Sequence, residues 1–180
     1  DAVTANQALV QWLPKKNTIA ELIASSKVDC TQAATDTSSA TVFVAFQRPR
    51  DITWRGETKS VAGRTLEEDF ALENLAWTQN VARKGLRLRI PKNDTITLDE
   101  LVGRIHKRVQ SSSFNKTEFA LGVIAADPAS WNVPQYIADG LRWLKDLMIA
   151  SRPELTVVVT EKPPAPANDA APATPMAEVV

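Results

Sequence analysis

The sequence has little with which to build a zinc site, a disulfide or a membrane span. Its 180 residues include one cysteine, Cys30, and one histidine, His106, which can form neither an internal disulfide nor a Cys/His zinc site. It has no run of about 18 apolar residues, and no basic start leads into an apolar segment. We therefore expect no membrane span and no secretory signal, and a cytoplasmic protein.

Familiar nucleotide and hydrolase motifs are missing as well. The sequence has no Gly-x-x-x-x-Gly-Lys-Ser/Thr phosphate loop, no Gly-x-Gly-x-x-Gly motif and no Gly-x-Ser-x-Gly elbow. A small standalone hydrolase is disfavoured because no nucleophile is paired with a base.

Net charge gives no general attraction to nucleic acid. The 21 basic and 21 acidic residues cancel, so a nucleic-acid site would have to be a local basic patch. The candidates for such a patch are Arg83, Lys84, Arg87, Arg89, Arg104, Lys107 and Arg108. A solvated helix face explains the same residues equally well.

The length and the 44% hydrophobic content suffice for one buried core, so we expect a single domain over residues 1–160. Because the chain starts at Asp1 without a methionine, we interpret it as part of a longer protein. Residues 161–180 are rich in proline and alanine and have few large apolar side chains. They are predicted to form a disordered tail.

Apolar spacing predicts an α/β fold that is rich in helices and has few strands. Helices are expected over residues 17–28, 65–84 and 116–126, from Thr97 and after Pro134. The run TVFVAF at 41–46 predicts a central strand buried on both faces, and residues 51–62 a loop or hairpin around Gly56. Alternation in LRLRI at 86–90 predicts a short, half-exposed strand, and residues 155–160 are predicted to form either a last strand or an extended tail.

Two of the predicted helices have well-defined apolar faces. The buried face of the helix from Thr97 is expected to contain Leu98, Leu101, Ile105 and Val109, and that of the final helix Ile137, Leu141, Leu144 and Met148.

Three consecutive carboxylates, Glu67, Glu68 and Asp69, follow Thr65 at the start of a predicted helix. One interpretation is a capping box, in which Glu68 closes the helix start while Glu67 and Asp69 lie in water. The alternative is a magnesium site that uses one or two of them with oxygens from elsewhere. Neighbouring helical residues point about 100° apart, so all three cannot bind one ion.

Lys116 lies at the start of another predicted helix, where a cation opposes the helix dipole. Such a placement suits a charge that stabilises a phosphoryl transition state, although an ordinary exposed lysine is the alternative. His106, between Ile105 and Lys107, is interpreted as a surface or boundary histidine rather than a base.

Three stretches together resemble a known family. They are TANQALVQWLP at 4–14, GRTLEEDFALEN at 63–74 and KTEFALGVIAADPASWNVPQYIADGLRWL at 116–144. In that order they are similar to the C-terminal part of ATP-dependent endonucleases of the OLD (overcoming lysogenization defect) family. The resemblance spans nearly all of residues 4–146.

The resemblance implies a partial Toprim-type α/β nuclease module that acts behind an ABC-like ATPase and cuts or nicks DNA with Mg²⁺ or Mn²⁺. Glu67 matches the glutamate of the family's Thr-Leu-Glu-x-Asp motif and is the first candidate metal ligand, with Asp69 second. Lys116 matches a lysine placed near the scissile phosphate. The implied partners are DNA and further copies of the full-length protein, with no membrane.

The chain also departs from the family pattern. It lacks the ATPase, the early Toprim glutamate and the Asp-x-Asp pair, so the isolated piece is expected to be nearly inert. The rival hypothesis is a non-catalytic helical module for assembly or docking. The nuclease hypothesis requires Glu67 and Lys116 to converge in space.

Overall fold

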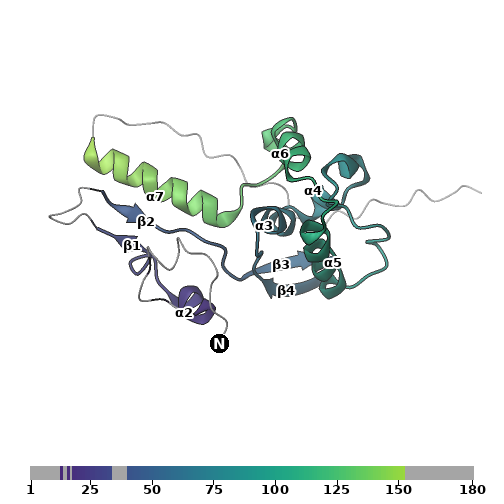
Figure 1. Cartoon of the computed structure of the whole chain (residues 1–180), viewed down its shortest axis with the longest axis horizontal. Helices are drawn as coiled ribbons and strands as arrows, with labels where there is room; N and C mark the ends of the chain where they lie inside the picture. The colour runs from purple at the N-terminus through teal and green to yellow at the C-terminus, as the bar shows by residue number, and fades with distance from the viewer. Residues whose placement is uncertain (1–12, 14–15, 17, 34–39, 153–180) are drawn as a thin grey trace, which may run out of the picture. The chain divides into compact units, whose positions relative to one another are not determined.

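The computed structural model describes residues 13, 16, 18–33 and 40–152 of the chain (Figure 1). These residues form a mixed α/β structure with two small, antiparallel, two-stranded sheets. They divide into two compact units, one containing Arg50–Asn132 and the other the described residues on either side of that range. The single domain expected over 1–160 is thus described as two units. The segment at 155–160 and the tail at 161–180 lie outside the described residues.

The first unit contains two helices and one small sheet. Its elements are α2 (Ile19–Ala24), β1 (Thr31–Gln32), β2 (Val42–Phe43) and α7 (Gln135–Ser151). Helix α2 begins with a complete capping box, because Thr18 Oγ1 accepts the N–H of Glu21 and the Glu21 carboxylate accepts the N–H of Thr18. The predicted helix at 17–28 is therefore present but shorter than expected.

The prediction of a central strand at 41–46 is wrong. Only Val42–Phe43 form a strand, paired with β1, and Val44 alone of this run is fully buried. The apolar side chains of this run pack elsewhere. Phe43 stacks on Trp143 of α7, with ring centroids 5.3 Å apart, and Val44 is buried in a cluster with Leu22 and Cys30. A short apolar run can be covered by a helix as well as by neighbouring strands, and periodicity alone does not distinguish the two.

The predicted buried face of α7 is also wrong. Leu141, Leu144 and Met148 are 58%, 46% and 55% exposed, and no residue of α7 is fully buried. The helix contacts β2 and its continuation through Trp143 and through Gly140, which approaches Ala45. An apolar stripe is buried only where the fold offers an opposing surface, and the described residues offer little beyond these contacts.

The second unit begins with a hairpin and continues with helices. Its elements are β3 (Arg50–Trp54), β4 (Glu57–Val61), α3 (Leu66–Glu73), α4 (Leu75–Gln79), the 3₁₀ helix η1 (Val81–Leu86), α5 (Leu98–Gln110), α6 (Lys116–Ile124) and the 3₁₀ helix η2 (Pro128–Ser130). Arg55 and Gly56 form the hairpin turn and both have positive φ, as a two-residue type I′ turn requires. Of the two alternatives predicted for 51–62, a loop or a hairpin, the hairpin is the one present.

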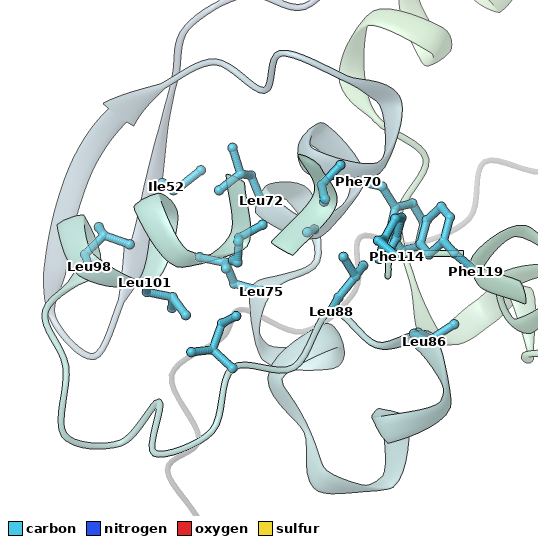
Figure 2. Packing of buried hydrophobic residues seen from close by; sticks show 14 residues of the cluster. Ile52, Phe70, Leu72, Leu75, Leu86, Leu88, Leu98, Leu101, Phe114 and Phe119 are labelled. Carbon is cyan, nitrogen blue, oxygen red and sulfur yellow. The ribbon is translucent and has the colours of Figure 1, made fainter. Parts of the chain in front are cut away.

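One hydrophobic core holds the second unit together (Figure 2). It joins Ile52 of β3 to the inner faces of α3, α4, α5 and α6. The predicted face of α5 is confirmed, and its four residues Leu98, Leu101, Ile105 and Val109 are all buried. Phe70 of α3 packs edge-on against Phe119 of α6, with ring centroids 5.4 Å apart. None of the described helices has the length and apolar character needed to cross a membrane.

The long helix predicted at 65–84 is interrupted at Asn74. Its backbone leaves the helical region, with φ −120° and ψ 41°, and α3 ends there. The Asn74 side chain donates to the carbonyl oxygens of Phe70 and Asn132 and accepts the N–H of Asn132 at 2.6 Å. This contact, 58 residues away in sequence, holds the break in place.

Residues 86–90 alternate as predicted but do not form a strand. Leu86, Leu88 and Ile90 are buried. The amide of Gln79 replaces the missing strand partner, because it donates to the carbonyl of Leu88 and accepts the N–H of Ile90 at 2.9 Å. A single buried side chain thus satisfies backbone groups that would otherwise need a sheet.

Gly63 allows the chain entering α3 to pass close to that helix. A Cβ at this position would lie 2.5 Å from the backbone N and Cα of Asp69. We expect Gly63→Ala to lower the free energy of unfolding by about 1–3 kcal/mol, since the backbone must shift to relieve the overlap. Gly103→Ala is the control, because Gly103 is an exposed residue of α5 with open space where a Cβ would lie. It should raise stability by up to about 1 kcal/mol. Urea unfolding measures both, and a destabilisation shared by the two variants would contradict the close-approach argument.

Candidate functional site

The three carboxylates at the start of α3 are all buried, and each meets a different basic partner. Glu67, Glu68 and Asp69 are 7%, 2% and 0% exposed. The capping interpretation is correct for Thr65, whose Oγ1 accepts the N–H of Glu68 at 3.2 Å. It is wrong in placing Glu67 and Asp69 in water. The turn of about 100° between neighbouring residues sends the three side chains to different parts of the unit.

Asp69 points to Arg50 of β3. Arg50 Nη1 lies 3.1 Å from Asp69 Oδ1, and Nη2 donates to the Asp69 carbonyl and lies 3.1 Å from Glu73 Oε2. The N–H of Gly63 also donates to Asp69 Oδ1. Asp69 therefore ties the hairpin to α3, and its complete burial and ion pair with Arg50 make it unsuitable as the second metal ligand that the family resemblance implies.

Glu68 points to His106 of α5. The Glu68 Oε2 atom is 3.1 Å from His106 Nδ1 and also accepts the N–H of Arg64 at 3.1 Å. The second ring nitrogen, Nε2, lies 2.9 Å from Arg64 Nη1. Arginine only donates, so Nε2 must accept and Nδ1 must carry the proton that is donated to Glu68. His106 thus links α3 to α5, as expected for a surface or boundary histidine.

Glu67 points to Lys116, the first residue of α6. Lys116 Nζ lies 3.1 Å from Glu67 Oε1, with the Lys116 side chain 63% exposed and that of Glu67 9% exposed. Helix α6 is capped independently by Asn115, whose Oδ1 accepts the N–H groups of Thr117 and Glu118. The lysine is therefore free of any capping role. Of the residues singled out in the sequence, Glu67 and Lys116 are brought together, and Asp69 is directed elsewhere.

The environment of Glu67 favours its ionised form. Burial by itself would raise the pKa of Glu67, but hydrogen bonds from its own backbone N–H, from Thr65 and from Lys116, together with the charge of Lys116, outweigh it. The pKa of Glu67 is consequently lowered from its ordinary value of 4.5. Glu67 is therefore ionised at neutral pH, beside a largely exposed ammonium group.

The lowered pKa of Glu67 predicts a pH dependence of stability. A carboxyl with a depressed pKa stabilises the folded state above the unfolded pKa and loses this contribution as the pH falls through the folded value. Glu67→Gln should therefore cost about 0.5–1 kcal/mol at pH 7, because Lys116 is mostly in water. The difference from wild type should shrink as the pH falls below 4.5. Urea unfolding across this range measures it, and a difference that grows towards acid pH would contradict the assignment.

The described residues show no ready-made metal site. No cluster of three or more His, Cys, Asp or Glu side chains suited to a metal ion occurs among them. Glu67 is the member of the trio whose basic partner is most exposed, since the Lys116 side chain is 63% exposed and those of His106 and Arg50 are 26% and 22% exposed. It fits the role of a single ligand to Mg²⁺, which usually takes one or two protein carboxylates and keeps several waters.

Arg50 and Arg64 were not identified from the sequence. Arg64 precedes the N-cap Thr65, and its backbone N–H rather than its side chain contacts Glu68, so helical side-chain spacing gives no signal for it. No local signal links Arg50 to Asp69 either, since the hairpin brings them together across 19 residues.

Comparison with known proteins found no match. No family model matches the chain, and no curated protein or solved structure matches it significantly.

Proposed function

We propose that this chain supplies part of the DNA-cleaving site of a metal-dependent, ATP-coupled endonuclease. The carboxylate of Glu67 and the ammonium group of Lys116, from α3 and α6, meet at 3.1 Å, and this observation carries the proposal. It is the convergence that the resemblance to the OLD family requires. The ATPase and most of the metal ligands would come from residues outside this chain, in a Toprim-type module.

Glu67 is the proposed ligand for Mg²⁺ or Mn²⁺. Its lowered pKa keeps the carboxylate ionised and ready to bind a cation at neutral pH. When bound, a divalent ion supplies charge stabilisation at the oxygens of a phosphodiester. Asp69 has no part in this proposal, because its carboxylate is buried against Arg50.

Lys116 is the proposed phosphate-contacting residue. An ammonium group has three N–H donors, and Glu67 takes one of them, so the others can donate to a phosphate oxygen. Its exposure gives a substrate access, and the ion pair with Glu67 fixes its position. A fixed cation stabilises the charge that develops as a phosphodiester bond breaks.

A second candidate function, assembly through helical surfaces, is favoured by the exposed apolar face of α7. Leu141, Leu144 and Met148 lie on that face. Surfaces of this kind often mark contacts with other chains, including further copies of the same protein. In this case the Glu67–Lys116 pair would be structural only.

Plasmid nicking distinguishes the two functions. The full-length protein that carries this chain would be assayed in Mg²⁺ and in Mn²⁺, with Glu67→Gln or Lys116→Met. Loss of nicking in both variants supports the nuclease, and wild-type nicking in both contradicts it and leaves the assembly function.

A further inference from the structure

A basic hollow lies beside α5, on the second unit. Its volume is about 380 Å³. Arg104, Lys107 and Arg108 line it together with Ser111, Ser113 and Pro91, and none of its lining residues is acidic. Three cations and two hydroxyl groups around one concavity are the donors that a phosphate group accepts from.

These three cations differ from most other basic residues of the unit in having no partner. Arg50, Lys59, Arg87 and Lys116 each pair with a carboxylate. By contrast, Arg104, Lys107 and Arg108 make no side-chain ion pair or hydrogen bond with any of the described residues. Their positive charge is thus available to a ligand.

Helix geometry separates this hollow from the acidic trio. Residues of a helix are rotated by about 100° per step, so Leu101, Ile105 and Val109 share the core face of α5. His106 lies on one flank and contacts Glu68, whereas Arg104 and Arg108, four residues apart, share the opposite flank. The carboxylates of α3 therefore do not neutralise the hollow.

We propose that this hollow binds a phosphate group of the DNA backbone. The proposal rests on the proposed function for its choice of DNA as the source of the phosphate. The surrounding sequence supports it, because residues 83–108 contain eight Lys and Arg but three Asp and Glu in a chain of zero net charge. Such a local excess attracts a polyanion without base-specific contacts.

Neither the helix dipole nor a membrane surface accounts for the hollow as well as a phosphate does. Complementing the dipole at the end of α5 explains Lys107 and Arg108 but not Arg104 or the serines. An acidic membrane surface would suit a basic helix with an exposed apolar face, but the apolar face of α5 is buried in the core.

The test is binding of a short fluorescein-labelled DNA duplex to the full 180-residue chain, followed by anisotropy. Lys107→Gln/Arg108→Gln should weaken binding roughly tenfold near 0.1 M salt and reduce the slope of log affinity against log salt by about 1 to 2. The matched control is Lys27→Gln/Lys145→Gln, which removes the same charge from exposed residues of the first unit. It should retain wild-type affinity and slope.

Equal weakening by the two double variants would overturn the proposal, because only net charge would then matter. Binding of inorganic phosphate to the wild-type chain, without binding of the duplex, would also overturn the assignment to DNA. The result is separable from the cleavage assignment: wild-type duplex binding by Lys107→Gln/Arg108→Gln would refute the hollow as a phosphate site and would leave the proposed roles of Glu67 and Lys116 to the nicking assay. Thermal unfolding of each variant excludes loss of fold as the cause.

Discussion

Replacing Arg50 by methionine should lower the free energy of unfolding of the Arg50–Asn132 unit by about 3–5 kcal/mol. The substitution leaves Asp69 as a fully buried carboxylate with no cation. Its Oδ2 atom has no hydrogen-bond partner among the described residues, and Oδ1 would keep the N–H of Gly63 as a donor. Glu73 would lose the same guanidinium. Urea unfolding, followed by tryptophan fluorescence, measures the change.

The control is Lys59→Met, which removes a cation from the other strand of the same hairpin. Lys59 pairs with Asp99, but both side chains are substantially exposed. Exposed pairs contribute about 0–1 kcal/mol, so this variant should remain close to wild type. A second test is Arg50→Met/Asp69→Leu, which removes both buried charges and should recover much of the loss. Equal effects of Arg50→Met and Lys59→Met would refute the view that burial makes the Arg50–Asp69 pair special.

Lys116→Met should reduce Mg²⁺-dependent nicking by the full-length protein by about 10²–10³-fold. Under the proposed function, the substitution removes the fixed cation that contacts the DNA phosphate. This contact stabilises the transition state most, because negative charge develops on the phosphate as the bond breaks. Chelation of the metal should abolish nicking in wild type. Because Lys116 is 63% exposed, the melting temperature should change little.

Arg87→Met is the matched control for this prediction. Arg87 forms an ion pair with Glu118 at 3.1 Å, and the side chains of both residues are exposed. Glu118 lies in the first turn of α6, the helix that Lys116 begins. The variant removes one cation from the same surface without touching Glu67. It should nick at the wild-type rate. A loss of similar size in Arg87→Met and Lys116→Met would indicate a general charge effect and count against a placed catalytic lysine.

Local patterns correctly predicted the elements that local interactions specify. The buried face of α5 was identified in full because its four apolar residues follow helical spacing. Gly56 indicated a loop or hairpin at 51–62, and the threonine cap at Thr65 indicated the start of α3. The meeting of Glu67 and Lys116 was expected from the family resemblance and not from spacing, since two different helices supply them.

Long-range contacts explain the parts that were not predicted. The helix break at Asn74 depends on the backbone of Asn132, and the extended segment at 86–90 depends on the side chain of Gln79. The apolar run at 41–46 predicted a central strand because burial by a helix and burial by a sheet leave the same apolar pattern.

The sequence by itself determined where α3 and α5 begin, which residues of α5 face the core, and that three adjacent carboxylates could not share one ion. These are consequences of capping and of a fixed rotation per residue, which act over a few positions. Only the tertiary structure decided that Glu67 meets Lys116, Glu68 meets His106 and Asp69 meets Arg50. The physical reason is that burial and the position of a distant basic side chain select the partner of each acid, and neither is encoded in the spacing of the acids themselves.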